Sequence, residues 1–235
     1  MFTFNSNRFS SLARLLAATA LLALGVGCHH GSDSSTDFGD NDASVVVGLG
    51  DSITFGIYDT GVDSCSESYR STAGYCPRLE GLSGKTVVNA GKCGEDSSEG
   101  LARISKALDR WRPGVILIDY SPNDLFNGVD AVISNLREMI AIARANKTVP
   151  ILGTLVPAVG EHAGWESFIE TLNPKILALC DEEGVPCADH HKAFVNNSSY
   201  IETPYALLSE DGLHPNAAGY ELMAETWREP LMRQY

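Results

Sequence analysis

Residues 44–54 read SVVVGLGDSIT, and this stretch decides the fold prediction. Its first half, the apolar run from Ser44 to Leu49, is typical of a buried β-strand. Gly50-Asp51-Ser52-Ile53-Thr54 follows at once. A chain that leaves a buried strand on a glycine, an acid and a serine places a hydroxyl at the edge of a sheet. Ser52 is therefore a candidate nucleophile.

Downstream of this stretch, short apolar runs alternate with longer segments of helical character. Such alternation predicts a parallel sheet with helices on both of its faces. We expect strands at residues 45–49, 86–89, 115–120, 149–154 and 185–188. We expect helices near residues 97–110, 129–146, 165–183 and 216–228. The pattern predicts one α/β domain over residues 44–235.

A serine becomes a good nucleophile only when a base lies within hydrogen-bond reach and a third group orients that base. The motif Asp211-Gly212-Leu213-His214-Pro215 supplies a carboxylate and an imidazole three residues apart. Pro215 biases His214 away from helical backbone angles, so we expect His214 on a loop before the last helix. Ser52, His214 and Asp211 thus form a candidate catalytic triad.

Two motifs in the middle of the chain could donate hydrogen bonds to an oxyanion. Val88-Asn89-Ala90-Gly91-Lys92-Cys93-Gly94 follows the second expected strand, and Ser121-Pro122-Asn123-Asp124 follows the third. Ligands of an open parallel sheet bind beyond the carboxyl ends of the strands. We therefore expect Ser52, Gly94 and Asn123 to converge at that edge.

These four blocks, in this order and spacing, resemble the SGNH hydrolases, also called the GDSL esterase and lipase family. The resemblance covers nearly the whole predicted domain. Residues 87–104, VVNAGKCGEDSSEGLARI, are especially similar to the exported bacterial lysophospholipase and thioesterase branch. The resemblance implies a three-layer α/β/α sandwich with a parallel, flavodoxin-like central sheet of about five strands. It also implies Ser52 as nucleophile, His214 as general base and acid, and Asp211 as the carboxylate that orients the histidine.

By the same resemblance, the oxyanion donors are the backbone N–H groups of Ser52 and Gly94 and the side-chain amide of Asn123. The implied reaction is serine-dependent hydrolysis of carboxylic esters through an acyl-enzyme, with short-chain acyl or acetyl esters favoured and no cofactor. Ser121 stands where the family usually has glycine. Because serine adds bulk near the cleft, we expect it to change the shape of the pocket more than the chemistry.

Two alternatives stay open. An O-acetyltransferase or deacetylase acting on cell-surface or plant polysaccharide would use the same catalytic groups. A catalytically silent module would keep the fold without the activity and would bind carbohydrate or a partner. Residues 58–75 form the longest expected loop, and loops leaving the first strand of such a sheet often shape the substrate pocket. We predict that this loop sets substrate choice.

Other polar residues are assigned structural roles. We expect Asp51 to shape its turn by accepting hydrogen bonds from nearby backbone amides, and Asp124 to stabilise its own loop. The neighbouring His190 and His191 have no carboxylate at ligand spacing, so we expect them to face solvent rather than to bind a metal. His162 is expected on a surface loop after the fourth strand.

The N-terminal 28 residues have the pattern of an export signal. Arg8 and Arg14 precede an apolar stretch at residues 15–26, which is too short to favour a permanent membrane span. Cys28 then resembles a bacterial lipoprotein processing site, at which lipidation would tether the protein to a membrane; ordinary secretory cleavage nearby is the alternative. Residues 29–43 are rich in Ser, Asp and Gly and are predicted to be a flexible tether. We expect an exported protein, located in the bacterial cell envelope or secreted.

The chain carries a formal net charge of −13, which becomes −15 when the two arginines of the signal are removed. An acidic surface of this kind argues against nucleic acid as a partner. The composition is 44% hydrophobic, which is enough for a substantial core. The expected partner is a small-molecule or carbohydrate ester.

Export permits disulfides, and five cysteines lie beyond the signal. Our preferred pairing closes two short loops, Cys65 with Cys76 and Cys180 with Cys187, and leaves Cys93 as a thiol. In the alternative, Cys93 bridges to Cys65 or to Cys76. No Cys-x-x-Cys pair is present, so the sequence gives little support to a metal site.

Overall fold

The computed structural model describes residues 36–61, 64–70, 72–120 and 122–235 of the chain. The predicted export signal with Cys28, and residues 29–35 of the predicted tether, lie outside the described residues. Ser121 lies outside them too. In the described part of the chain, no helix is long and apolar enough to cross a membrane.

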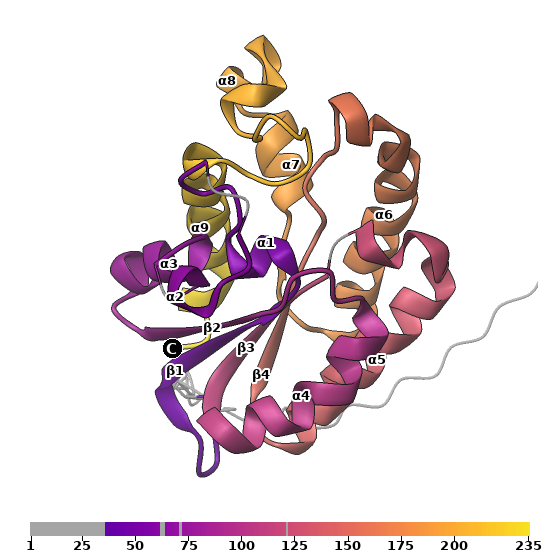
Figure 1. The fold of residues 1–235 in the computed structure, drawn as a ribbon. Coiled ribbons are helices and arrows are strands. Elements are labelled where there is room, and N and C mark those ends of the chain that lie inside the picture. The colour runs from indigo at the N-terminus through magenta and orange to yellow at the C-terminus, as the bar shows by residue number, and fades with distance from the viewer. Residues whose placement is uncertain (1–35, 62–63, 71, 121) are drawn as a thin grey trace, which may run out of the picture. The chain divides into compact units, whose positions relative to one another are not determined.

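A five-stranded parallel sheet forms the centre of the domain (Figure 1). The strands are β1 (Asp42–Gly50), β2 (Thr86–Gly91), β3 (Pro113–Asp119), β4 (Val149–Gly153) and β5 (Cys187–Ala188). Their order is β2-β1-β3-β4-β5. This is the flavodoxin-like, doubly wound order, in which the chain reverses direction across the sheet between β1 and β3. The predicted fold class is confirmed.

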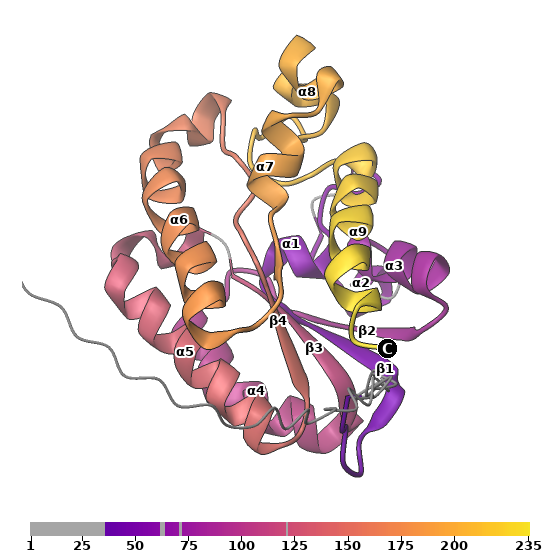
Figure 2. The ribbon, with the colours of Figure 1, turned by 180° about the vertical axis from the view of Figure 1, so that it is seen from behind.

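Helices cover both faces of the sheet, as the views from the front and from behind show (Figure 1, Figure 2). One hydrophobic core lies between the sheet and the helices α4 (Ser97–Trp111), α5 (Val129–Ala145) and α6 (Glu166–Glu183). The second lies between the sheet and the helices α3 (Tyr75–Ser83) and α9 (Ala217–Met232). Every residue of β3 is buried, because both faces of the sheet are covered.

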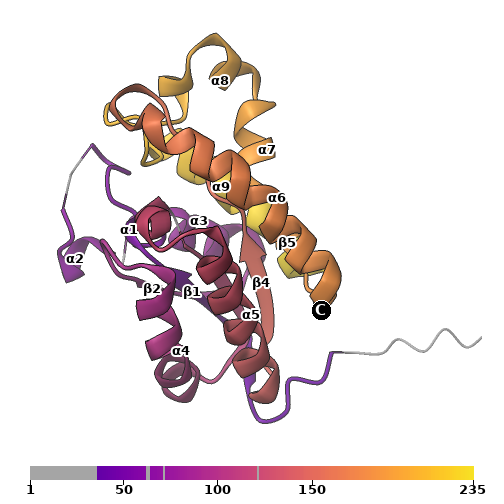
Figure 3. The same ribbon diagram turned by 90° about the vertical axis from the view of Figure 1, so that its right-hand side faces the viewer.

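Short helices gather near the carboxyl ends of the strands. These are α1 (Ser52–Phe55), α2 (Glu67–Arg70), α7 (His190–Val195) and α8 (Ser198–Glu202), with 3-10 turns η1 (Pro122–Phe126), η2 (Gly160–Trp165) and η3 (Pro204–Ala206). The side view shows α7 and α8 beyond the end of the sheet (Figure 3). The loops that follow the strands therefore form the face on which a ligand site is expected.

The domain begins earlier than residue 44. β1 starts at Asp42, and the segment before it contacts the body of the domain. Lys147 forms an ion pair with Asp37 at 2.7 Å, and Asn41 donates a hydrogen bond to the carbonyl of Asn146 at 2.6 Å. The expected boundary at Ser44 is therefore too late.

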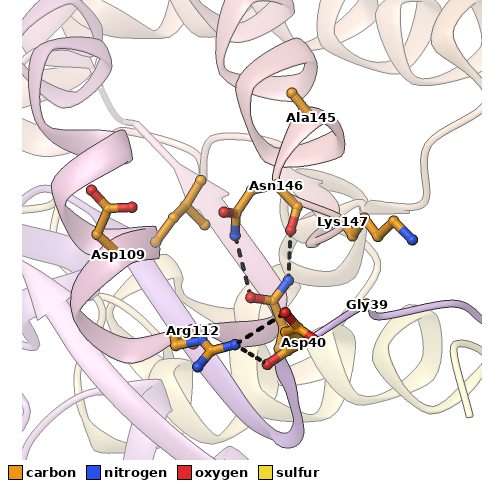
Figure 4. A pocket seen from close by; sticks show the side chains of 9 residues that line it. Gly39, Asp40, Asp109, Arg112, Ala145, Asn146 and Lys147 are labelled. Carbon is orange, nitrogen blue, oxygen red and sulfur yellow. Dashed lines mark hydrogen bonds and ion pairs between the residues drawn. The ribbon is translucent and has the colours of Figure 1, made fainter.

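A pocket lies between this segment and the ends of α4 and α5 (Figure 4). Its polar groups are largely bonded to one another: Arg112 donates to the carbonyl of Asp40 at 2.6 Å, and Asn41 contacts Asn146. The pocket borders the amino ends of β1 and β3, at the edge of the sheet opposite to the candidate catalytic residues. We assign it no role in the chemistry.

The disulfides differ in part from the preferred pairing. Cys180 pairs with Cys187, but Cys65 pairs with Cys93, and Cys76 is a buried free thiol. The expected Cys65–Cys76 pair is wrong, because Cys76 lies in the first turn of α3 and faces the sheet, where a Cβ atom on Gly48 would lie 3.0 Å from its sulfur. Burial raises the pKa of the Cys76 thiol. The open alternative, in which Cys93 bridges Cys65, is the observed one.

Candidate active site

The nucleophile turn is built by close backbone packing at the end of β1. A Cβ atom on Gly50 would lie 2.1 Å from the carbonyl oxygen of Asp119 on β3, so only glycine fits there. The same is true of Gly91 at the end of β2, where a Cβ would lie 2.2 Å from the backbone nitrogen of Phe55. These two glycines let α1 pack directly onto the strand ends.

Ser52 is the first residue of α1, and its side chain is almost buried. The carboxylate of Asp51 caps this helix by accepting a hydrogen bond from the backbone N–H of Ile53 at 2.9 Å. The interpretation of Asp51 as a turn-forming residue is confirmed. By capping α1, Asp51 holds in place the helix turn that carries Ser52.

The structure brings the three predicted triad residues together. The hydroxyl oxygen of Ser52 lies 2.9 Å from Nε2 of His214, and Nδ1 of His214 lies 2.5 Å from Oδ2 of Asp211. His214 is on a bend before α9, as its position before Pro215 predicts. Serine, imidazole and carboxylate thus form one continuous line of hydrogen bonds, the arrangement of a nucleophile, its base and an orienting acid.

Asp211 is held ionised by several donors. Its Oδ1 accepts hydrogen bonds from the hydroxyl of Ser209 at 2.6 Å and from the backbone N–H groups of Leu213 at 2.9 Å and His214 at 3.0 Å. Burial disfavours the charged carboxylate, but the bonds from His214, Ser209 and Leu213 outweigh it and hold the pKa of Asp211 well below its ordinary value. A charged Asp211 is suited to fixing the proton of His214 on Nδ1.

The two expected oxyanion donors beyond Ser52 follow neighbouring strands: Gly94 lies after β2 and Asn123 after β3. Gly94 adopts the left-handed φ of +72°, and a Cβ there would meet nothing within 4 Å. Within the part of the chain that the structure describes, the backbone N–H groups of Ser52 and Gly94 have no hydrogen-bond acceptor. The amide of Asn123 donates to the carbonyl of Glu95 at 3.1 Å and lies 3.4 Å from Asp51.

A buried ionic network that the sequence analysis did not identify supports this face. The carboxylate of Glu95 accepts hydrogen bonds from Arg103 at 2.7 Å and from the hydroxyl of Tyr120 at 3.1 Å, and Arg103 also donates to the carbonyl of Gly50 at 3.1 Å. Burial opposes the charge on Arg103, but the hydrogen bonds that Arg103 donates to Glu95 outweigh it and raise the pKa of the guanidinium. The network joins the end of β1 to the residue that follows Gly94.

Asp124 stabilises the loop after β3, as expected. Its carboxylate accepts hydrogen bonds from the backbone N–H of Ser97 at 2.9 Å and from the Ser97 hydroxyl at 2.7 Å, which ties η1 to the first turn of α4. That helix begins with a capping box in which Asp96 and Glu99 exchange hydrogen bonds. The neighbouring Asn123 is therefore held on a well-anchored turn.

Two aromatic rings lie near the triad, and the sequence analysis did not single out the first of them. The ring of Tyr58 stacks on that of His214 at a centroid distance of 5.4 Å. Nδ1 of His162 lies 2.7 Å from the backbone carbonyl of Asp211, and its ring packs edge-on against Trp165. His162 sits in a partly exposed turn, as expected, but it also contacts the loop that carries Asp211.

The expectation for His190 is wrong. Its side chain is fully buried against Trp227 at 4.7 Å between ring centroids, and neither ring nitrogen has a partner among the described residues. His191 is partly exposed and lies 3.1 Å from the carboxylate of Glu166. Across residues 36–61, 64–70, 72–120 and 122–235, no cluster of three or more His, Cys, Asp or Glu side chains is placed to hold a metal.

Asp119 at the end of β3 is a buried carboxyl that the sequence analysis did not single out. Its Oδ2 has no hydrogen-bond partner among the described residues. Burial, and then the nearby charge of Asp51, raise its pKa well above the ordinary value. Burial thus disfavours a negative charge on Asp119, which packs beneath the nucleophile turn.

Comparison with known proteins agrees with this geometry. Residues 49–222 match the GDSL-like Lipase/Acylhydrolase family. The chain is 25% identical over 218 residues to a multidomain esterase of Ruminococcus flavefaciens; the match covers 79% of this chain and 28% of that protein. It is also 25% identical over 169 residues to thioesterase 1/protease 1/lysophospholipase L1 of Escherichia coli K12, covering 69% and 77%.

Solved structures show the same architecture. The lipase/acylhydrolase from Enterococcus faecalis superposes with a TM-score of 0.64 at 26% sequence identity, covering 80% of this chain and 96% of that one. A family match over most of the chain and a shared fold together define the class of protein. The chain belongs to the GDSL-like lipase/acylhydrolase family. It is a carboxylic ester hydrolase.

Proposed function

We propose that this protein is a serine esterase that works through an acyl-enzyme. The observation that carries the proposal is the continuous line of hydrogen bonds from Asp211 through His214 to Ser52, with distances of 2.5 and 2.9 Å. With the proton of His214 held on Nδ1 by Asp211, Nε2 is free to accept the proton of the serine hydroxyl.

Each step of the reaction then has a residue to perform it. As Ser52 attacks the ester carbonyl, the negative oxygen of the tetrahedral intermediate accepts hydrogen bonds from the N–H groups of Ser52 and Gly94 and from the amide of Asn123. His214 returns the proton to the departing alcohol. Water activated by the same histidine hydrolyses the acyl-enzyme.

We propose short-chain acyl or acetyl esters as the substrates. Polar side chains border the oxyanion donors: Lys92 and Glu95 lie on either side of Gly94 and form an ion pair at 3.5 Å, and Asp124 follows Asn123. A long alkyl chain on this side of the site would cover the ammonium group of Lys92, whose side chain is 61% exposed, without replacing its contacts with water. A small acyl group avoids that cost.

Hydrolysis of p-nitrophenyl esters from acetyl to palmitoyl tests both parts of the proposal. We expect the highest kcat/KM for the shortest chains, and a loss of at least about 1,000-fold in kcat for Ser52→Ala with an unchanged circular dichroism spectrum. Ser98→Ala, on an exposed position of α4, is the matched control and should keep wild-type rates. Full activity in Ser52→Ala would exclude the serine mechanism, and a preference for palmitate would exclude the short-chain proposal.

We also propose that the protein is exported. The two disulfides support this, because disulfides persist mainly in oxidising compartments. Attachment to a membrane through a lipidated Cys28 is the corresponding proposal for location. Mass spectrometry of the mature N-terminus tests it: a diacylglyceryl-modified Cys28 would support attachment, and an unmodified N-terminus at another residue would exclude it.

A further inference from the structure

The ring of Tyr58 lies against one face of the imidazole of His214. The two ring centroids are 5.4 Å apart and the ring planes are inclined by 30°, which is a stacked arrangement. Three contacts thus bear on the orientation of this imidazole: Asp211 at Nδ1, Ser52 at Nε2 and Tyr58 on the ring face. The first two act along the plane of the ring, whereas the third restrains its tilt out of that plane.

The backbone of Tyr58 adopts a conformation that tyrosine rarely takes. Its φ is +63°, in the left-handed region that favours glycine. A bulky residue stays in this region only where the surrounding structure holds it there, and such residues gather at functional sites. A glycine would relieve the backbone strain, but it would leave the face of the imidazole without its neighbouring ring.

Both chain neighbours of Tyr58 are anchored to the body of the domain. The carbonyl of Ile57 accepts a hydrogen bond at 2.9 Å from the hydroxyl of Tyr220 on α9. The buried carboxylate of Asp59 accepts two hydrogen bonds from the guanidinium of Arg78 on α3, at 2.7 and 2.8 Å. Relaxation of Tyr58 to ordinary backbone angles would disturb these bonds. The fold thus holds the tyrosine ring in place despite the local strain.

Acylation of Ser52 changes how the imidazole is held; this step rests on the proposed serine mechanism. In the free enzyme the serine hydroxyl donates to Nε2 of His214, with 2.9 Å between the two atoms. Acylation joins the serine oxygen to the acyl carbon, while the serine proton passes through Nε2 to the departing alcohol. The esterified oxygen carries no proton. The acyl-enzyme therefore lacks the hydrogen bond that aligned Nε2.

In the acyl-enzyme, the orientation of the imidazole depends on the other two contacts. Asp211 still holds Nδ1, at 2.5 Å. With one hydrogen bond fewer, the imidazole is held less firmly, and the stacked ring of Tyr58 limits how far it can tilt. Alignment is needed at this stage, because Nε2 must accept a proton from the water that attacks the acyl carbon.

We propose that Tyr58 is a positioning residue for deacylation. Its ring keeps Nε2 of His214 directed at the attacking water when Ser52 no longer does so. In this step the water oxygen bonds to the acyl carbon and its proton passes to Nε2. That proton then returns to the serine oxygen as the bond between this oxygen and the acyl carbon breaks. Removal of the tyrosine ring therefore slows deacylation more than acylation.

Pre-steady-state hydrolysis of p-nitrophenyl acetate tests this difference. Release of p-nitrophenol follows acylation, and mass spectrometry of the intact protein in quenched samples follows the acetyl-enzyme. Fitting both time courses gives the two rate constants. For Tyr58→Ala, we expect the rate constant of deacylation to fall about tenfold, the size of effect that an aromatic contact supplies, and that of acylation to stay within about threefold of wild type.

Three further variants separate the ring from the fold. Tyr58→Phe keeps the ring and should keep wild-type deacylation. Tyr58→Gly should lose deacylation as Tyr58→Ala does, yet melt about 2–4 °C higher than Tyr58→Ala, because glycine accepts the left-handed backbone. Tyr200→Ala is the matched control. It removes a partly buried tyrosine ring that packs against Phe194 on α7, and both rate constants should stay unchanged.

Equal losses of acylation and deacylation in Tyr58→Ala, or no loss of deacylation, would overturn the proposal. Wild-type deacylation in Tyr58→Gly would overturn it too, because the ring would then be dispensable. A folded wild-type protein that hydrolyses no ester would instead contradict the proposed function, before any variant of Tyr58 is measured.

Discussion

The side-chain amide of Asn123 is assigned two roles: it anchors its own turn, and it donates a hydrogen bond to the oxyanion. Its amide holds the carbonyl of Glu95 at 3.1 Å and is the only side-chain donor that we assign to the oxyanion. Loss of one such donor lowers kcat by about 100- to 1,000-fold with little effect on KM. We therefore predict a loss of about this size for Asn123→Ala in steady-state kinetics with p-nitrophenyl acetate.

Asn127 offers the matched control for this variant. It belongs to the same turn, where its amide contacts Asp96 at 3.0 Å and Asp124 at 3.2 Å, but it is assigned no contact with the substrate. Asn127→Ala should lower stability slightly and leave kcat within a few-fold of wild type. Equal losses of kcat in the two variants would show that Asn123 acts only by holding its turn.

His190 makes the stability of the domain depend on acid. Burial lowers its pKa to about 3 in the folded protein, while an unfolded chain binds the proton near pH 6.5. Between those two values the unfolded state holds more protons, so the free energy of unfolding falls as the pH falls. The contribution of one such group is about 1.4 kcal/mol per pH unit.

We predict that His190→Leu flattens this dependence. Urea denaturation at pH 7, 6, 5 and 4 should show a smaller loss of unfolding free energy in the variant than in the wild type. Phe194→Leu, at a buried position of the same helix that carries no ionisable group, is the control and should keep the wild-type slope. Parallel curves for the wild type and His190→Leu would contradict the assignment.

The sequence predicts the position of a single residue when neighbouring residues in the chain determine that position. Asp211 and His214 lie three residues apart on one bend, and Ser52 directly follows a strand. The short motif around each residue is therefore enough to predict where it lies in the fold. The burial of His190 depends on Trp227 of α9, and the partner of Cys65 depends on where the loop after β2 passes. Both are tertiary contacts that no local pattern contains.

Among the elements, the loop after β2 is covalently linked to the segment that follows α1. Cys93 immediately precedes Gly94, and its disulfide to Cys65 closes a span of 28 residues. Freeing this loop would let the N–H of Gly94 move relative to Ser52. Because that donor must be fixed in advance to stabilise an oxyanion, kcat should fall when the bridge is removed.

We predict that the double variant Cys65→Ser with Cys93→Ser lowers kcat about tenfold and also lowers Tm. The matched control is Cys180→Ser with Cys187→Ser, which removes the bridge between α6 and β5, and this variant should lower Tm with kcat nearly unchanged. The measurements are esterase kinetics at 25 °C and thermal melting. A similar kcat loss in both double variants would exclude a specific effect on Gly94.

Long elements were predictable, and short ones were not. The helices α4, α5, α6 and α9 lie within a few residues of their expected ranges, because each is long enough to show apolar periodicity. The helices α2, α7 and α8 have four to six residues, too few to carry that signal. Strand β5 is reduced to two residues of the expected range 185–188 and is the shortest strand in the sheet.

For the whole molecule, the alternation of strands and helices predicts layers but not the order of strands. That order, β2-β1-β3-β4-β5, was implied by the family resemblance and is present in the structure. It places the ends of β1 and β3 side by side, with Gly50 opposite Asp119 in register. The amide of Asn123 reaches Asp51 in the nucleophile turn, at 3.4 Å, because the sheet reverses its winding between these two strands.

The hydrogen bond between Ser52 and His214 joins residues 162 positions apart. Ser52 is carried by the first strand, and His214 is positioned by the packing of α9, the last helix, against α3. Contacts between such distant segments form late in folding, because closing a long loop costs entropy before the contact repays it. The triad can therefore exist only in chains in which β1 and α9 have already docked into the domain.

Recovery of esterase activity therefore reports the last step of folding. After dilution from urea, we predict that the recovery of p-nitrophenyl acetate hydrolysis lags behind the recovery of helical circular dichroism, since helices such as α4 and α5 depend on nearby contacts. Stopped-flow refolding with both signals measures the delay. Activity that returned together with the earliest helical signal would mean that β1 and α9 associate at the outset, so that their docking begins folding instead of finishing it.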